Sequence, residues 1–306
     1  MEAQATCLRE IKSKARVFVT TDIGNEPDDS ESFVRYLLYA NEFRTEGLVP
    51  CTSTHQRTFT LVDNLNAHTH PNNKHPTAEA LFDLVKPGPA VYGKQALEPG
   101  VPLAEGTKLL IQQVDASDDE PLWVLCWGGS NVIAQALHHV QAERSPTELS
   151  SFVSKLRIYM ISGQGDTGPW HRANFPALFL ICSIHGWCQY KTATWWGIAC
   201  PEDGVDKAQF SLERLDQHIR LGSLGKTYPY PAYQIEGDTP SFPYLIPNGL
   251  GSPENPSWGS WDGRYDPVDL SFQVHHYADS TDLVIGKDGK TYQSNFATVW
   301  RWAEAF

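Results

Sequence analysis

Short apolar segments that alternate with amphipathic segments constrain the fold of this 306-residue chain more than any other feature. Residues 16–21 (RVFVTT), 123–127 (WVLCW) and 156–161 (LRIYMI) are rich in branched and aromatic side chains, as expected of buried strands. Residues 30–43 and the stretch from Asn131 onward space their apolar side chains as amphipathic helices do. This alternation predicts an α/β fold with a mostly parallel central sheet and helices on both faces.

Three further segments extend the pattern. Residues 45–54 (TEGLVPCTST) are interpreted as a second strand that ends in a polar loop, and residues 77–85 (TAEALFDLV) as a helix. Residues 177–184 (ALFLICSI) are apolar throughout, which leaves helix and strand both open.

The character of the chain changes after about residue 225, where proline, glycine and aromatic residues become frequent. Such a segment is too apolar for a disordered linker, so we expect long ordered loops that wall the ligand crevice. Neither a repeat nor a domain boundary is visible. We therefore expect an N-terminal extension over residues 1–15 and a single domain over residues 16–306.

The charge and the apolar runs exclude several classes of partner. A net charge of −12 argues against binding to a nucleic-acid backbone or an anionic membrane surface. The N-terminus lacks the apolar core of a secretory signal, and no run approaches the ~20 residues of a membrane span. We expect a cytoplasmic protein, or a secreted one if a leader has been removed. The six cysteines form no CxxC pair and are interpreted as buried thiols.

Acidic residues crowd directly behind the first predicted strand. Asp22, Asp28 and Asp29 fall with Glu26 in a loop that contains glycine and proline. Carboxylate oxygens are the ligands that hard divalent cations prefer, and calcium accepts about six to eight oxygens. One aspartate would be enough to cap the helix that follows, so the cluster favours a metal site over capping alone. Glu26 is a candidate for substrate contact, with a plain surface acid as the alternative.

Other polar candidates follow later strands. The carboxyl ends of parallel strands meet at one edge of a sheet, where the ligand crevice lies. The turn at Gly128–Gly129 and the loop around Asp166 should therefore join the acidic loop there. We take Asp166 and His55 as candidate substrate contacts, and His171 as a candidate acid because it is near the Asp166 loop. Each lone histidine is also well explained as a hydrogen-bonded structural residue.

Aromatic residues provide a second kind of candidate. Trp258, Trp261 and Tyr265, in the aromatic C-terminal part, could stack on a sugar or a base. They could equally pack the long loop onto the domain.

The stretch VTTDIGNEPDDSESFVRYLLYANEF resembles the opening of the family described as cellulose-binding, nucleoside-hydrolase-like. Matching stretches follow in order: EGLVPCTST, PLWVLCWGGSNVIAQAL, SKLRIYMISGQGDTGPWHRANFP and EGDTPSFPYLIPNGLGSPENPSWGSWDGRY. The resemblance begins at about Arg16 and covers nearly the whole chain. It implies a nucleoside-hydrolase-like α/β fold related to calcium-dependent inosine–uridine nucleoside hydrolases.

The resemblance also implies roles for individual residues. By position, Asp22 and Asp29 would bind calcium, with magnesium as the less favoured ion, and Asp28 would contact a sugar hydroxyl or the attacking water. The last carboxylate ligand would be Asp238. Two further residues match the family pattern more loosely. They are a carbonyl ligand at Cys126 or Trp127 and a sugar contact at Asn174. Nucleoside hydrolases have a histidine before the last aspartate, whereas this chain has Gly237.

These observations lead to three hypotheses about function. The first is a calcium-dependent hydrolase of a glycosidic or N-ribosidic bond, in which Asp22 accepts the proton of the attacking water. The second is a repurposed enzyme that cyclises or isomerises a small metabolite. The third is a carbohydrate-binding protein without catalysis. The expected partner is a small-molecule or sugar-containing substrate, and a homodimer is left open.

Overall fold

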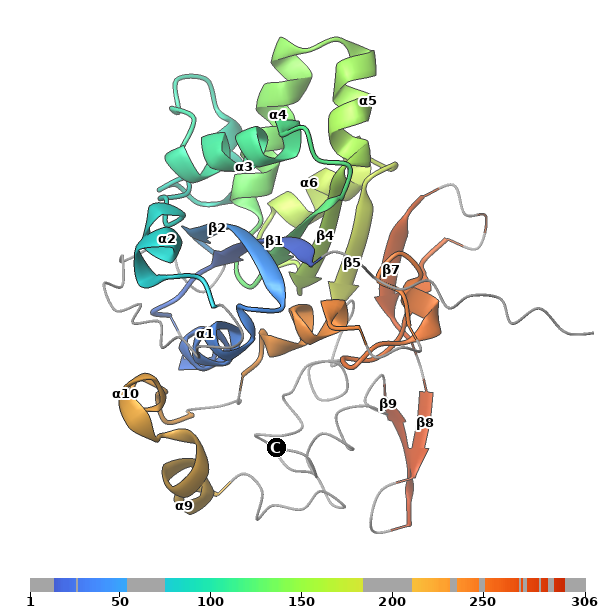
Figure 1. The fold of residues 1–306 in the computed structure, drawn as a ribbon. Helices are drawn as coiled ribbons and strands as arrows, with labels where there is room; N and C mark the ends of the chain where they lie inside the picture. Colours follow the sequence, from blue (N-terminus) through green and yellow to red (C-terminus); the bar gives the residue numbers. More distant parts are fainter. Residues whose placement is uncertain are drawn as a thin grey trace, which may run out of the picture.

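The structure is a computed structural model, shown in Figure 1. It describes residues 14–25, 27–53, 75–183, 211–231, 236–247, 251–269, 271, 274–280, 282–285 and 289–294.

A seven-stranded sheet with the order β2–β1–β3–β4–β5–β7–β6 forms the centre of the described part. Every neighbouring pair is parallel except β6 and β7 at one edge. The strands are β1 (Ala15–Thr21), β2 (Phe43–Pro50), β3 (Leu122–Cys126), β4 (Leu156–Ile161), β5 (Phe179–Ser183), β6 (Tyr265–Pro267) and β7 (His276–Asp279). The predicted, mostly parallel sheet is thus confirmed, and the ambiguous segment 177–184 contains strand β5.

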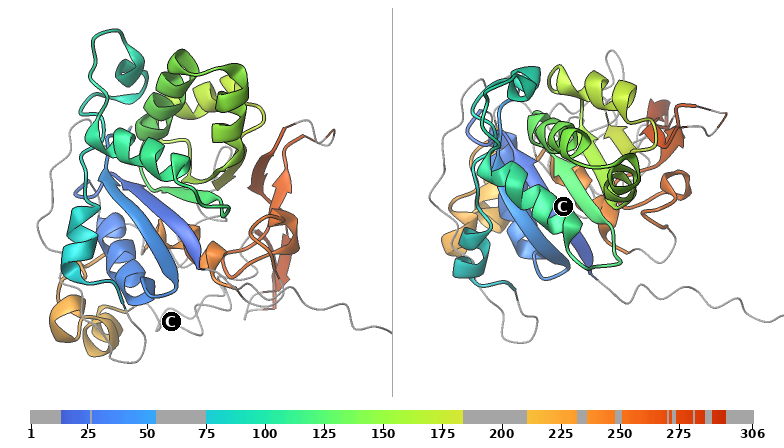
Figure 2. Two further views of the ribbon diagram at one scale, coloured as in Figure 1. Left: turned by 45° about the horizontal axis from the view of Figure 1, so that its top comes forward. Right: turned by 90° about the horizontal axis from the view of Figure 1, so that it is seen from above.

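Helices cover both faces of this sheet (Figure 2). On one face lie α3 (Glu105–Asp115), α4 (Asn131–Glu143), α5 (Pro146–Ser154) and α6 (Thr167–Asn174). On the other lie α1 (Pro27–Tyr39) and two short 3₁₀ turns, η4 (Thr239–Ser241) and η5 (Pro243–Leu245). Strand alternation divides the core accordingly, because Phe18 packs on the first face while Val17 and Val19 pack on the second.

The remaining elements lie around these layers. They are α2 (Ala78–Asp83), η1 (Gly93–Leu97), α9 (Leu212–Arg214), the π-helical η3 (Leu215–Ile219), α10 (Gly222–Gly225), η6 (Pro256–Trp258), and the antiparallel pair β8 (Asp282–Ile285) and β9 (Thr291–Ser294). No helix within the described ranges is both long and apolar enough to cross a membrane. Cys51, Cys126 and Cys182 are buried and free, as expected.

The loops after residue 225 are ordered where the structure describes them, as expected. Phe242, Tyr244 and Tyr265 are buried and pack with Trp123 and Trp127 against the sheet. Their rings meet in edge-on and tilted arrangements, such as Trp123 against Tyr244 with centroids 5.6 Å apart. These aromatic contacts fasten the segment of Phe242 to Tyr265 to the second face of the sheet.

Several helices were not expected from the sequence, among them α3, α5 and α6. The segment taken as a Gly/Asp loop contains α6, which accepts Pro169 because the first turn of a helix needs no backbone N–H there. Helix α5 begins with a capping box, in which Ser145 and Glu148 bond each other's backbone N–H groups, and Pro146 follows the cap. The stretch SPTE at 145–148 carried that signal.

Candidate functional site

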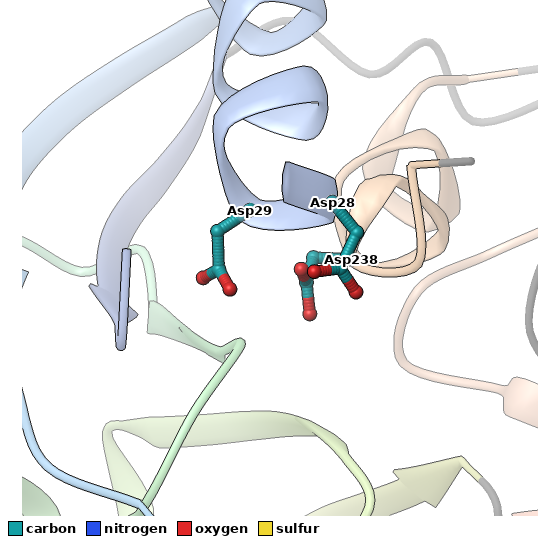
Figure 3. Close-up of side chains that lie close together, drawn as sticks. All are labelled: Asp28, Asp29 and Asp238. Atoms are coloured by element: carbon teal, nitrogen blue, oxygen red, sulfur yellow. The ribbon is translucent and has the colours of Figure 1, made fainter. Parts of the chain in front are cut away.

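Three buried aspartates converge at the carboxyl edge of the sheet (Figure 3). Asp28 and Asp29 occupy the first turn of α1, and Asp238 immediately precedes η4. One carboxylate oxygen from each lies within 4.8 Å of the other two. In the close-up the side chains of Asp28 and Asp238 lie next to each other, and Asp29 extends from the adjacent position on the helix. Residues far apart in sequence thus form one acidic group.

The end of strand β1 places the first two acids. The hydroxyl of Thr21, the last residue of β1, donates a hydrogen bond to the carboxylate of Asp29. The same hydroxyl accepts from the backbone N–H of Ile23 at 3.0 Å, which turns the chain out of the strand. Gly24 continues this turn with a φ of 99°, a conformation that favours glycine. Strand, turn and helix are therefore bonded together at this corner.

Asp22 lies beside this group and against the WGG turn, whose two glycines have no room for a side chain. The hydroxyl of Ser53 donates to the buried Asp22 carboxylate. A Cβ atom at Gly128 would lie 2.6 Å from Asp22 Oδ1, and one at Gly129 would lie 2.0 Å from the carbonyl oxygen of Thr52. Only glycine allows the turn after β3 to approach the ends of β1 and β2 so closely.

The structure groups the acids differently from the expected ligand set. The family resemblance implied that Asp22, Asp29 and Asp238 bind the metal and that Asp28 contacts the substrate or water. In the structure, Asp28 rather than Asp22 joins Asp29 and Asp238. Asp22 is still close enough for its charge to act on Asp238.

Burial and mutual repulsion make the acidic group electrostatically unfavourable by itself. The pKa of Asp238 is raised well above its usual range, first by burial and then by the charges of Asp29, Asp28 and Asp22. Its Oδ2 atom has no hydrogen-bond partner among the described residues. A buried carboxylate needs a proton, a donor or a cation as compensation. A set of buried carboxylate oxygens fits a hard divalent cation such as calcium or magnesium.

Trp127 lies at the other side of this corner and is fully buried. Its carbonyl oxygen, the expected metal ligand, accepts a hydrogen bond from Gln164 Nε2 at 2.7 Å. Its indole N–H donates to Ser241 Oγ at 2.7 Å, and this hydroxyl donates to the carbonyl oxygen of Asp238 at 2.7 Å. A carbonyl oxygen has two lone pairs, so the contact with Gln164 leaves one for a further ligand.

The position of His171 contradicts its assignment as an acid. The side chain is fully buried on α6, and burial lowers its pKa to about 3. At neutral pH the imidazole is therefore in its neutral form, which is a poor general acid, and its burial closes it off from solvent. His171 is therefore not part of the proposed site.

Asn174 is also wrongly assigned. It is the last residue of α6 and is exposed, and its side-chain amide donates to the carbonyl oxygen of Trp170 at 2.8 Å. Helix α6 starts at the edge of the sheet where the loops gather and runs away from it, so its C-terminal end points away from the crevice. The direction of this segment was not predicted, because the sequence indicated a loop rather than a helix here.

The other expected substrate contacts differ in what they bond to and in how exposed they are. Asp166 accepts from the backbone N–H of Lys94 at 2.8 Å, so its carboxylate holds η1 against the start of α6. Trp258 and Trp261 are 63% and 40% exposed. Glu26 and His55 lie outside the described residues.

A buried polar network that was not predicted from the sequence lies behind the acids. Glu31 and Arg35 on α1 meet Glu236, which lies two residues before Asp238. Burial raises the pKa of Glu31 to about 8, and the carboxylates of Glu236 and Asp28 add to the effect. The available signal was the i, i+4 spacing of Glu31 and Arg35 on a helix whose neighbouring residues are core-facing.

Comparison with known proteins adds the family. Residues 16–265 match the family described as cellulose-binding Sde182, nucleoside hydrolase-like domain. The chain belongs to this family. The resemblance inferred from the sequence is thereby confirmed, and this nucleoside hydrolase-like domain occupies most of the chain.

A solved structure agrees with this assignment. A nucleoside hydrolase-related hypothetical protein from Saccharophagus degradans, described as associated with carbohydrate metabolism, superposes with a TM-score of 0.71 and 31% identity. The alignment covers 96% of the present chain and 69% of the other. The effector protein XOO4466 is similar at a TM-score of 0.43 and 11% identity, too weak to support a conclusion. None of the curated proteins is a significant match.

Proposed function

We propose that this nucleoside hydrolase-like domain is a calcium-dependent hydrolase of a glycosidic or N-ribosidic bond in a sugar-containing small molecule. One observation carries the proposal: buried oxygens of Asp28, Asp29 and Asp238 lie within 4.8 Å of one another. The unpartnered Oδ2 of Asp238 supports it, because a buried carboxylate oxygen is costly without a ligand. The nucleoside hydrolase-like family supports the choice of reaction.

The three aspartates would hold the ion, and the Trp127 carbonyl would contribute a further oxygen. Bound calcium would lower the pKa of a coordinated water and bind vicinal sugar hydroxyls. Asp22, which accepts a hydrogen bond from the Ser53 hydroxyl, would accept a proton as a general base. The surrounding carboxylates would stabilise the positive charge that develops on the sugar in an oxocarbenium-like transition state.

The residues available to protonate a leaving group indicate which kind of substrate should react. Gly237 stands where nucleoside hydrolases have a histidine, and His171 is fully buried with a lowered pKa. Neither residue would therefore protonate a leaving group. Substrates whose leaving group departs as a stable anion should react faster than those that need a proton.

The activity prediction follows from these assignments. The protein should release 4-nitrophenol from a 4-nitrophenyl riboside or glycoside faster than it releases hypoxanthine from inosine, and EDTA should abolish both reactions. Asp29→Asn should reduce kcat/KM by at least ~100-fold, because it removes a charged ligand of the group. Asp216→Asn, on η3, is a control that should leave the rates unchanged. Equal rates with EDTA and with calcium would contradict the proposal.

A second candidate is carbohydrate binding without catalysis, which the exposed tryptophans favour. Trp258 ends η6, Trp261 follows it, and both side chains are exposed. Asp262, the next residue, accepts hydrogen bonds from the hydroxyls of Tyr159 and Tyr265. Exposed rings on a fixed loop can stack on sugar rings with little loss of conformational freedom. The cellulose-binding description of the family supports this alternative.

The binding prediction separates the two candidates. Under the second, the protein should be retained on insoluble cellulose equally well with calcium and with EDTA. Trp258→Ala should weaken retention about tenfold, which corresponds to about 1.4 kcal/mol. Leu221→Ala, at another exposed apolar residue, is the control. An unaltered binding isotherm for Trp258→Ala, or no retention of the wild-type protein, would exclude this surface.

A further inference from the structure

Asp238 needs a device that holds it beside Asp28 and Asp29. It lies 206 positions after Ser32 of α1, yet its backbone N–H donates to the Ser32 hydroxyl at 3.3 Å. The described elements that follow it, η4 and η5, are only 3 residues each. The position of Asp238 therefore depends on side-chain contacts with α1.

Glu236 provides the strongest of these contacts. It is fully buried and has a φ of 52°, a left-handed conformation that is uncommon outside glycine. Its two carboxylate oxygens accept from the Arg35 guanidinium, one of them at 2.9 Å from Nη2. The hydroxyls of Tyr228 and Thr239 also donate to it, each at 2.9 Å. A two-pronged guanidinium–carboxylate pair fixes both distance and orientation.

The backbone of Glu236 is bound to the same helix. Its N–H donates to Glu31 Oε2 at 2.8 Å. Glu31, Ser32 and Arg35 therefore all hold the segment of Asp238, and all belong to α1. The first turn of that helix carries Asp28 and Asp29. One rigid helix thus carries two acids of the group and anchors the third.

We infer that Arg35 is a positioning residue of the acidic site: by binding both oxygens of Glu236, it fixes Asp238 at coordinating distance from Asp28 and Asp29. The part of the inference that concerns metal affinity rests on the proposed function. The part that concerns docking of the segment on α1 does not.

Charge and position predict opposite effects for loss of Arg35. If only its positive charge mattered, its removal from the vicinity of several carboxylates would strengthen cation binding. If it positions Asp238, its removal weakens cation binding. Arg35→Met therefore separates the two explanations by the sign of the change.

The experiment measures calcium binding by isothermal titration calorimetry and terbium binding by luminescence. Arg35→Met should bind each ion at least ~10-fold more weakly than wild type. Arg35→Lys should be intermediate, because an ammonium keeps the charge but cannot form two parallel bonds. The matched control is Arg157→Met, since Arg157 pairs with Glu254 and is 19% exposed, against 16% for Arg35. This control should bind both ions as wild type does.

Hydrogen exchange of the metal-free proteins gives a readout that needs no metal. The N–H groups of residues 236–242 report on docking, because several of them bond to α1 or within the segment. They should exchange faster in Arg35→Met, and to a lesser degree in Arg35→Lys, but not in Arg157→Met. If Arg35→Met does not fold, Arg35→Lys carries both measurements.

The possible outcomes are distinct. Unchanged exchange at 236–242 would overturn the inference, whatever the metal affinity. Faster exchange with equal or tighter ion binding would show that docking does not position Asp238, and would also overturn it. A wild-type protein that binds neither ion would refute the proposed function, while the exchange data would still decide whether Arg35 docks the segment.

Discussion

Asp238→Asn should abolish calcium binding and yet leave the metal-free protein as stable as the wild type, or more stable. The pKa of Asp238 is raised well above its usual range by burial and by three neighbouring aspartates. Without a cation, this carboxyl is therefore favoured in its protonated form, which asparagine closely resembles in size and polarity. With a cation, the charged form is required as a ligand, and asparagine cannot supply it.

The expected size follows from mass action. Calcium at 100 times its dissociation constant should stabilise the wild-type protein by about 2.7 kcal/mol. For a chain of this length, that corresponds to an increase in Tm of roughly 5 °C. Differential scanning calorimetry should show this increase for the wild type and none for Asp238→Asn. In EDTA, the two proteins should melt at similar temperatures, or the variant at the higher one.

The sign in EDTA distinguishes a ligand from a structural residue. If Asp238 mainly stabilised the fold through hydrogen bonds, Asp238→Asn would melt at a lower temperature with and without calcium. Asp266→Asn removes an exposed carboxylate and serves as the control, which should retain the full calcium effect. An equal calcium-induced increase in wild type and Asp238→Asn would contradict the assignment of Asp238 as a ligand.

The fold was predictable because its signals are local. Buried strands such as 16–21 and 156–161 consist of consecutive apolar residues, and each stands next to a segment with helical spacing. Parallel pairing then brings the loops after β1, β3 and β4 to one edge without further information. The WGG turn was likewise recognisable, and the closeness of Gly128 to Asp22 gives its physical reason.

The site was only partly predictable because its other signals are not local. The sequence indicated the acidic cluster, but not that Asp28 would join Asp29 and Asp238 while Asp22 bonds to Ser53. The ion pair between Arg35 and Glu236 joins positions 201 apart, which no spacing rule reveals. The burial of His171 depended on recognising α6, where glycine and proline near the start suggested a loop.

A second large effect concerns Asp262, a buried residue within the segment that carries the exposed tryptophans. Burial raises the pKa of this carboxyl from 3.8 to about 8, the hydroxyls of Tyr159 and Tyr265 oppose the rise, and the charge of Asp279 adds to it. The unfolded chain loses this proton near pH 4, whereas the folded protein keeps it until about pH 8. Asp262 therefore stabilises the fold fully below pH 4, and this contribution is lost as the pH rises through 8.

The measurable consequence is the slope of the free energy of unfolding against pH. Between pH 5 and 7 the unfolded state binds fewer protons at this position, so the free energy of unfolding should fall with pH by up to about 1.4 kcal/mol per unit because of Asp262 alone. Asp262→Asn has no proton to lose, and its curve should be flatter than that of the wild type by about this amount. Urea denaturation in EDTA, at each pH, gives both curves without a contribution from metal binding.

The difference between the slopes of wild type and Asp262→Asn reports on Asp262 more directly than the stability of either protein does. Other groups, such as Glu31, titrate in the same range, but they are present in both proteins and largely cancel in the difference. The exposed control Asp266→Asn should follow the wild-type slope. Parallel curves for wild type and Asp262→Asn would mean that Asp262 is ionised in the folded protein. The two tyrosine hydroxyls would then be its compensating donors, and the loop of Trp258 would be held by a charged anchor rather than a neutral one.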